Sequence, residues 1–217
     1  MRRANGSAIE TVFVVDDDSA ICAGLCDLLE SAGLVARHFS SAEEFLGKWN
    51  PGMAGCLVLD VRLPGINGME LHSNLLISQI TLPVIIMTGH GDMPMVRKAL
   101  KAGAVEFLIK PFQDEELLQA VEQAYTLDRA QRQAGDLVNS IQARAETLTA
   151  REREVMAFVT AGLTNKEIAE ELCLCVVTIK LHRGQVMRKM QARSLADLVK
   201  MSERINPHRG SCAVGSS

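Results

Sequence analysis

Six side chains that could bind a cation and a phosphoryl group each follow a short apolar segment of this chain. In chain order they are Asp16, Asp17, Asp18, Asp60, Thr88 and Lys110. Carboxylates packed together repel one another and need a cation, and hard oxygen ligands with room for water suit Mg²⁺. A lysine adds a fixed positive charge and a threonine adds a hydroxyl donor. Such a set can accept a phosphoryl group on a carboxylate, with the cation and the lysine offsetting the charge on the phosphoryl oxygens.

These side chains can meet only if the segments before them are parallel neighbouring strands. Short, apolar, largely β-branched segments predict strands at 11–15, 34–38, 56–59, 84–87 and 105–109. Amphipathic segments predict helices at about 19–32, 41–48, 68–78, 92–102 and 113–130. Strict alternation of strand and helix predicts an α/β doubly wound, five-stranded parallel sheet of the flavodoxin-like kind. Ligand sites in such sheets lie beyond the carboxyl ends of the strands, where these side chains would converge.

The chain changes character after residue 128. Residues 129–146 contain few large apolar groups and predict a helical linker. After them, a capping residue precedes an acid by three positions at Thr149, Thr164 and Ser194. These patterns predict helices at about 149–160, 165–172 and 194–205, with a fourth at 176–190. We expect an all-α four-helix domain over 147–205 and a disordered tail over 206–217.

Charge divides the chain in the same place. Residues 1–128 carry 9 Lys/Arg against 17 Asp/Glu, a net charge of −8, whereas residues 129–217 carry 14 against 9, a net charge of +5. An acidic first half joined to a basic second half indicates two domains with different partners, the second suited to a polyanion.

The sequence shows no sign of a membrane protein or of a disulfide scaffold. No apolar stretch approaches the roughly 18 residues that span a bilayer, and the N-terminus leads directly into polar residues. We therefore expect a cytoplasmic protein without a membrane partner. The cysteines form no CxxC motif, and reduced thiols are the expected state. A redox role stays open for Cys22, Cys26, Cys173 and Cys175.

The first half resembles the receiver domain of two-component response regulators. The resemblance rests on residues 14–18 (VVDDD), 57–65 (LVLDVRLPG), 87–91 (MTGHG) and 107–112 (FLIKPF), and it assigns a receiver domain to residues 8–128. It implies that Asp60 is the phosphoacceptor. It also implies a Mg²⁺ site formed by Asp16, Asp17, Asp60 and the backbone carbonyl of Arg62. Asp18 is expected to cap the first helix instead of binding the metal.

The same resemblance implies a conformational switch. Thr88 and Lys110 would contact the phosphoryl group, and Lys110–Pro111 would be a cis peptide, which is plausible because the second residue is proline. Phe107 stands at the aromatic switch position: Thr88 would move inward and leave space for Phe107, which reshapes the face formed by residues 92–109. Phe107 could equally be a packing residue. His90, in the loop beside the site, is expected to be incidental.

The second half contains a basic helix preceded by an acidic one. Residues 180–193 carry five Lys/Arg and no acid, and residues 165–172 are amphipathic, as in a helix pair whose second member enters the major groove. Residues 148–155 (LTAREREV), 162–169 (GLTNKEIA) and 178–183 (TIKLHR) resemble the LuxR-type helix-turn-helix. With the receiver, this resemblance places the chain in the FixJ/NarL group. It implies base contacts from Lys180, Leu181 and Gly184, and phosphate contacts from Thr178, Arg183, Arg188 and Lys189.

Four positions depart from that pattern or weaken it. Cys173 stands where the group usually has Gly at the turn, Cys175 where it has a Ser or Thr cap, and Val177 where it has a polar or basic residue. A thiol caps less well than a hydroxyl, by up to about 1 kcal/mol, and Gly184 lowers helix propensity by about 1 kcal/mol relative to Ala. We expect a domain that still binds DNA, with unusual or relaxed base choice.

Three functions from different classes fit these residues. The leading hypothesis is a regulator that accepts a phosphoryl group on Asp60 from a sensor histidine kinase, forms a homodimer through the 92–109 face and binds double-stranded DNA. Met93, Met95 and Val96 would supply apolar dimer contacts, and RNA polymerase is a further candidate partner. An aspartyl-phosphate enzyme is disfavoured because Val61 and Arg62 follow Asp60, where such hydrolases carry an acid two residues later. A phosphorylation-independent DNA binder or adaptor is disfavoured because the predicted site is intact.

Overall fold

The computed structural model describes residues 8–89 and 93–206, apart from the side chains of residues 93–95 and 98. The chain divides into two compact units, residues 1–132 and 133–217, and each is described by itself. His90, the side chains of Met93 and Met95, and residues 207–217 of the expected disordered tail lie outside the described part.

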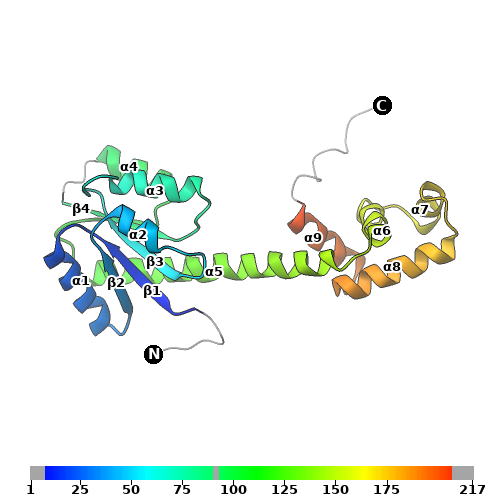
Figure 1. Ribbon diagram of the computed structural model, residues 1–217, viewed down its shortest axis with the longest axis horizontal. Coiled ribbons are helices and arrows are strands. Elements are labelled where there is room, and N and C mark those ends of the chain that lie inside the picture. The colour runs from blue at the N-terminus through cyan, green and yellow to red at the C-terminus, as the bar shows by residue number, and fades with distance from the viewer. Residues whose placement is uncertain (1–7, 90–92, 207–217) are drawn as a thin grey trace. The chain divides into compact units, whose positions relative to one another are not determined.

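A five-stranded parallel sheet forms the centre of the first unit (Figure 1). Its spatial order is β2-β1-β3-β4-β5, which confirms the predicted fold class. Each strand lies within two residues of its predicted bounds: β1 (Glu10–Val15), β2 (Val35–Phe39), β3 (Ala54–Asp60), β4 (Val84–Thr88) and β5 (Glu106–Ile109).

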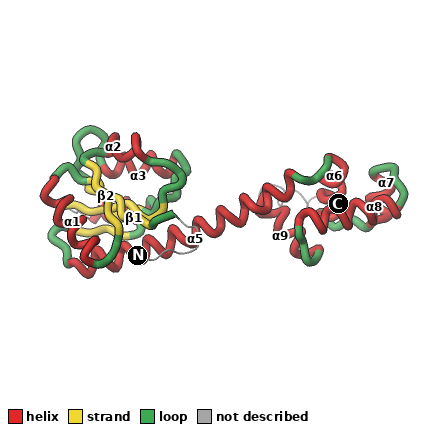
Figure 2. Tube along the Cα trace, turned by 60° about the horizontal axis from the view of Figure 1, so that its bottom comes forward, coloured by secondary structure: helices red, strands yellow, loops and turns green. Residues whose placement is uncertain are grey.

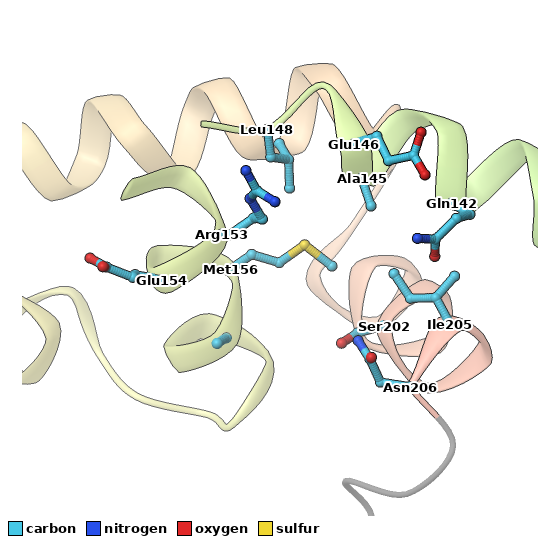
Figure 3. A pocket seen from close by; sticks show the side chains of 11 residues that line it. Gln142, Ala145, Glu146, Leu148, Arg153, Glu154, Met156, Ser202, Ile205 and Asn206 are labelled. Carbon is cyan, nitrogen blue, oxygen red and sulfur yellow. The ribbon is translucent and has the colours of Figure 1, made fainter. Parts of the chain in front are cut away.

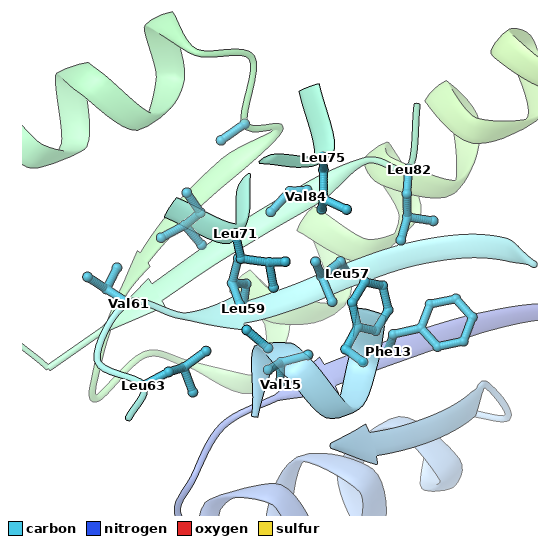
Figure 4. Packing of buried hydrophobic residues seen from close by; sticks show 14 of the residues in the cluster. Phe13, Val15, Leu57, Leu59, Val61, Leu63, Leu71, Leu75, Leu82 and Val84 are labelled. Carbon is cyan, nitrogen blue, oxygen red and sulfur yellow. The ribbon is translucent and has the colours of Figure 1, made fainter. Parts of the chain in front are cut away.

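Helices cover both faces of this sheet, as Figure 2 shows. They are α1 (Ser19–Ser31), α2 (Ala42–Lys48), α3 (Gly68–Ile77), α4 (Met93–Lys101) and α5 (Asp114–Glu146). Neighbouring residues on a strand point to opposite faces, so Leu57 and Leu59 of β3 pack under α2, α3 and α4 (Figure 4), whereas Val58 packs under α1 and α5. Burial on both faces explains why the central strands are apolar without alternation.

Polar side chains cap the N-termini of α1, α2 and α3. Asp18 accepts hydrogen bonds from the backbone N–H groups of Ala20 and Ile21, which confirms its expected capping role. Ser41 caps α2 through the N–H of Glu44. Asn67, which was not predicted, forms a full capping box with Glu70 at α3. These bonds satisfy N–H groups that have no partner inside the helix.

Helix α5 is longer than predicted. It runs without interruption from Asp114 to Glu146, so the segment 129–146, expected as a helical linker, is the second part of one helix. The helix continues because residues 129–146 are mostly good helix formers without Pro. Ile141, near its end, is 1% exposed and belongs to the core of the second unit.

The second unit adds α6 (Ala150–Thr160), α7 (Asn165–Glu171), α8 (Val176–Met190) and α9 (Leu195–Ile205). Thr149 and Thr164 form the predicted capping boxes, and Ser194 caps α9 through the N–H of Asp197. Residues from all four helices and from α5 share one core, which is centred on Val155, Ile168, Ile179, Val186 and Leu198.

A hollow of about 440 Å³ lies between the end of α5, α6 and α9 (Figure 3). Leu148, Met156 and Ile205 supply apolar walls, and Arg153 and Glu154 are charged neighbours. None of the side chains predicted to bind the cation or the phosphoryl group lines it, and no residue of α8 does. None of the helices in the described residues is both long and apolar enough to cross a bilayer.

Candidate phosphorylation site and DNA-contacting helix

Strand register brings the predicted phosphorylation residues to one edge of the sheet. Val15 is paired with Leu59, Asp60 with Met87, and Thr88 with Ile109. Residues 16, 60, 88 and 110, which end these strands or directly follow them, are therefore neighbours at the carboxyl edge. This is the edge at which open α/β sheets bind ligands.

Asp16 and Asp60 share one cation at this edge. Lys110 Nζ lies 2.6 Å from Asp16 Oδ2 and 2.7 Å from Asp60 Oδ1. Both carboxylates are nearly enclosed, with 2% and 5% of the residue exposed. The second oxygen of Asp60 accepts a hydrogen bond from the backbone N–H of Arg62 at 2.5 Å, and Asp16 Oδ1 accepts one from the N–H of Asp18. These bonds fix the directions of the carboxylates.

Lys110 remains a cation in this environment. Burial alone would lower its pKa, but hydrogen bonds to Asp16 and Asp60 and the charges of both acids outweigh burial and raise the pKa above its ordinary value. The Lys110–Pro111 peptide is cis, as predicted.

Thr88 and Gly68 complete the surroundings of Asp60. Thr88 is buried at the end of β4. Gly68, the first residue of α3, donates its N–H to the carbonyl of Val61, and a β-carbon at this position would lie 2.1 Å from the carbonyl oxygen of Asp60. Only glycine allows so close an approach of helix and strand. The sequence did not predict this contact of Gly68, because the contact depends on where α3 meets β3.

The predicted metal ligands divide into two groups. Because Asp16 and Asp60 hold the same lysine, their oxygens lie close enough together for one cation to contact both. Asp17 is exposed, and Arg62 presents its N–H to Asp60. Within residues 8–89 and 93–206, no cluster of three or more Asp, Glu, His or Cys side chains is arranged to hold a metal ion. The structure therefore brings together two of the three expected carboxylates.

Phe107 lies beneath the 92–109 face. It is 9% exposed and packs in the same core cluster as Val96 and Ala99 of α4. Val96 is only partly exposed. The exposed large apolar residues on this face are Leu100 and Ile109 in the described part of the chain, and sequence reasoning had singled out neither.

The predicted DNA contacts lie on α8, and several of them share one exposed side. Lys180, Leu181, Gly184 and Arg188 are exposed, and Thr178 is half-buried. Ile179, Val186 and Met190 on the opposite side are buried in the core of the unit. The side of α8 that carries Lys180, Leu181, Gly184 and Arg188 is therefore the accessible one.

Three of the predicted cations on α8 have partners inside the unit. Arg183 donates to Asn165 Oδ1 at the start of α7, and Arg188 donates to Gln185 Oε1. Lys189 Nζ lies 2.6 Å from Glu152 Oε2 of α6 and also donates to the carbonyl of Thr147. Lys189 therefore joins α8 to α6, a role that sequence reasoning had not assigned to it.

The turn before α8 shows the consequences of its two cysteines. Cys173 has φ of +51°, the left-handed conformation in which glycine is favoured. Cys175 stands at the N-cap and makes no capping hydrogen bond to the helix backbone, as expected for a thiol. Its Sγ instead lies 3.0 Å from Thr178 Oγ1, and this hydrogen bond lowers the pKa of the thiol.

Both halves of the chain match known protein families. Residues 12–122 match the family described as response regulator receiver domain, and residues 146–202 match bacterial regulatory proteins of the luxR family. Fold and site together define a response regulator with a DNA-binding output domain.

Whole-length relatives support the same assignment. Nodulation protein W of Bradyrhizobium diazoefficiens is 49% identical over 89% of this chain and 86% of its own length. The transcriptional regulatory protein FixJ of the same organism is 43% identical over 89% of this chain and 94% of its own length. The solved structure of the response regulator StyR, 45% identical, matches with a TM-score of 0.80 over 91% of this chain and all of its own. The chain belongs to the response regulators with a receiver domain and a LuxR-type DNA-binding domain, which regulate transcription in two-component systems.

Proposed function

We propose that Asp60 is the phosphoacceptor, and that its phosphorylation by a sensor histidine kinase makes the protein dimerise and bind duplex DNA. The observation that carries this proposal is the enclosed Asp16–Lys110–Asp60 arrangement at the carboxyl edge of the sheet. Burying three ionisable groups with so little solvent costs free energy, and groups of this kind cluster at functional sites.

The proposed transfer needs no further reactant. A carboxylate oxygen of Asp60 attacks the phosphorus of a phosphohistidine on the kinase, the P–N bond breaks, and its electron pair stays on the imidazole, which takes a proton. Lys110 then pairs with the new negative charge from its place beside Asp60 Oδ1. The N–H of Arg62 holds the other carboxylate oxygen and thereby orients the nucleophile. We expect no turnover of a separate substrate.

Mg²⁺ is the proposed cofactor. Asp16 and Asp60 offer hard oxygen donors to one cation, and Asp17 and the carbonyl of Arg62 lie in the adjoining loops as the remaining candidate ligands. When bound, the ion would offset charge on the phosphoryl oxygens. Asp16 has a second role without the metal, because it shares Lys110 with the nucleophile.

The proposed switch connects Thr88 to Phe107. Phe107 is already largely enclosed, so the change we propose is a repacking of this ring against Val96 and Ala99 when Thr88 contacts the phosphoryl group. The exposed Leu100 of α4 and Ile109 of β5 would supply apolar contact in a homodimer. Binding of two half-sites by a dimer then raises affinity through effective concentration.

Output is assigned to the C-terminal unit. We propose a receiver domain at 8–128, a helical connection at 129–146 and a DNA-binding domain at 147–205, acting in the cytoplasm and with RNA polymerase as a candidate partner. Lys180, Leu181 and Gly184 would face base edges. Thr178, Arg183 and Arg188 would contact phosphates, whereas Lys189 is already engaged by Glu152. The printed names of relatives such as nodulation protein W and FixJ support a role in transcription.

The phosphoacceptor is tested by treating the full chain with a small acyl phosphate donor and Mg²⁺. We expect one acid-stable, base-labile phosphoryl group per chain, measured as a mass gain, and none with Asp60→Asn. Asp18→Asn is the matched control, because Asp18 caps α1 and asparagine caps equally well. Unchanged incorporation in Asp60→Asn would overturn the assignment.

A further inference from the structure

Two large apolar side chains stand in solvent on helix α8. Val177 is 74% exposed and Leu181 is 62% exposed, and their spacing of four residues places them one turn apart on the same side of the helix. Neither packs against the core of the unit, although their neighbours Val176 and Ile179 do. The fold therefore does not explain why these two residues are apolar.

The same side of α8 carries little else. Lys180 lies between the two apolar residues and is exposed. Gly184 follows about one turn after Leu181, and no atom would lie within 4 Å of a β-carbon added there. Arg183 points instead to Asn165. The exposed stripe at the N-terminal half of α8 thus consists of valine, lysine, leucine and glycine. In helix-turn-helix proteins this half of the second helix meets the base edges.

An apolar stripe in the major groove has one chemical partner among the bases. Base edges there present hydrogen-bond donors and acceptors, apart from the C5-methyl group of thymine. We propose that Val177 and Leu181 determine specificity by packing on thymine methyl groups. This inference rests on the proposed DNA binding by α8 and adds the chemistry by which the helix selects its site.

Helix geometry limits how the thymines are spaced. Four residues rise about 6 Å along a helix, whereas successive bases on one strand are about 3.4 Å apart. A helix lying along the groove would carry Val177 and Leu181 across roughly two base steps. Each half-site should contain two thymines that are adjacent or separated by one base.

Uracil tests the proposal because it differs from thymine only by the methyl group. The full chain, treated with an acyl phosphate donor, is first used to select bound duplexes from random sequence. In the best duplex, each thymine is then replaced singly by deoxyuridine and affinity is measured by fluorescence anisotropy. For wild type we expect about a fourfold loss at one or two positions per half-site, the size of one buried methyl contact.

The Val177→Ser variant identifies the residue responsible. At one thymine where uracil weakens binding of the wild type, Val177→Ser should bind the thymine and uracil duplexes with equal affinity. Leu181→Ser should show the same loss of discrimination at the other thymine. Val177 and Leu181 lie outside the core, so both variants should keep the wild-type melting temperature. Gln185→Ser, a half-buried position on the flank of α8, is the control and should retain the uracil effect at both positions.

Two results would overturn the inference. One is that no replacement of a thymine by uracil lowers the affinity more than twofold, or that the selected half-site contains no thymine. The other is a uracil effect that persists unchanged in Val177→Ser and Leu181→Ser, which would place the contact elsewhere. Absence of any preferred duplex is a different outcome, because it appears before uracil is introduced, and it would overturn the proposed DNA binding together with this inference.

Discussion

At the scale of single residues, Gly68 sets the distance between helix α3 and the nucleophile. A β-carbon there would lie 2.1 Å from the Asp60 carbonyl oxygen, so Gly68→Ala must push the strand end and the helix apart. We predict a loss of about 1–3 kcal/mol in the free energy of unfolding, from overpacking. The phosphorylation rate should fall by about tenfold or more, because the nucleophile is displaced.

Gly24→Ala is the control for this prediction. Gly24 lies inside α1 with nothing within 4 Å of an added β-carbon, so alanine should stabilise the helix by up to about 1 kcal/mol. Urea unfolding and donor-dependent phosphorylation measure both quantities. Equal behaviour of the two variants would show that Gly68 has no special contact.

Cys173 is a second residue whose backbone determines its effect. A non-glycine residue with a φ of +51° is destabilised by about 1–2 kcal/mol. Glycine avoids this cost, but it loses more conformational freedom on folding, and this loss offsets part of the gain. We predict that Cys173→Gly raises the free energy of unfolding of the second unit by about 0.5–1 kcal/mol. Cys173→Ala keeps the unfavourable conformation and should not. Thermal unfolding followed by circular dichroism distinguishes the two variants, and stabilisation by alanine as well would assign the effect to the thiol.

Some of these residues were predictable from the sequence and others were not, for identifiable physical reasons. Asp16, Asp60, Thr88 and Lys110 were predictable because parallel strands bring their own ends together. The pair of Glu152 and Lys189 was not, because 37 residues separate its members and no local pattern links them. Gly68 shows the same limit, because its close contact depends on where α3 meets β3.

At the scale of elements, the contact between α6 and α8 depends on charge. The hydrogen bond that Glu152 accepts from Lys189 is the largest cause that lowers the pKa of Glu152, and the bond from the Thr149 backbone N–H is the second largest. An acid whose folded pKa is lowered contributes stability above its unfolded pKa, and that contribution is lost as the pH falls through the folded pKa. We predict that the protection of α6 and α8 amides from hydrogen exchange decreases as the pH falls below about 4.5.

Glu152→Gln should remove this pH dependence and lower local stability at neutral pH by about 1 kcal/mol. Glutamine still satisfies the capping box, so the loss reports the charge pair. Glu167→Gln is the matched control, because Glu167 occupies the same place in the α7 capping box and its pKa is lowered by hydrogen bonds to Thr164 alone. An identical pH dependence in wild type and Glu152→Gln would contradict the proposed role of the pair.

Elements were predictable to the extent that local pattern fixes them. The capping residues Thr149, Thr164 and Ser194 set helix starts correctly. The helical character of residues 129–146 was predicted, but its continuity with the helix expected at 113–130 was not, because no local pattern links the two segments. Local propensity carries the helix through this segment, and Ile141 anchors its second part in the core of the second unit.

At the scale of the whole molecule, the acidic part of the chain carries the proposed phosphorylation site and the basic part carries the proposed DNA-binding helix. The second part of the chain carries a net charge of +5 beyond residue 128, so DNA binding should weaken as salt rises because counterions are released. We predict that Arg188→Ala weakens binding to all sequences alike and reduces the slope of log affinity against log salt by about 1. Lys189→Ala should leave that slope unchanged, because its ammonium group is paired with Glu152. Equal slopes for the two variants would contradict the assignment of phosphate contacts.

We propose that phosphorylation of Asp60 controls DNA binding by the same chain. The most direct measurement is the affinity of the full chain for its selected duplex, with and without an acyl phosphate donor, together with its mass in solution by light scattering. For wild type we predict a dimer and at least about 100-fold tighter binding after treatment, the low end of the gain from linking two sites. Asp60→Asn should remain at the untreated values. Tight binding that is the same in wild type and Asp60→Asn, with or without donor, would contradict control by phosphorylation of Asp60.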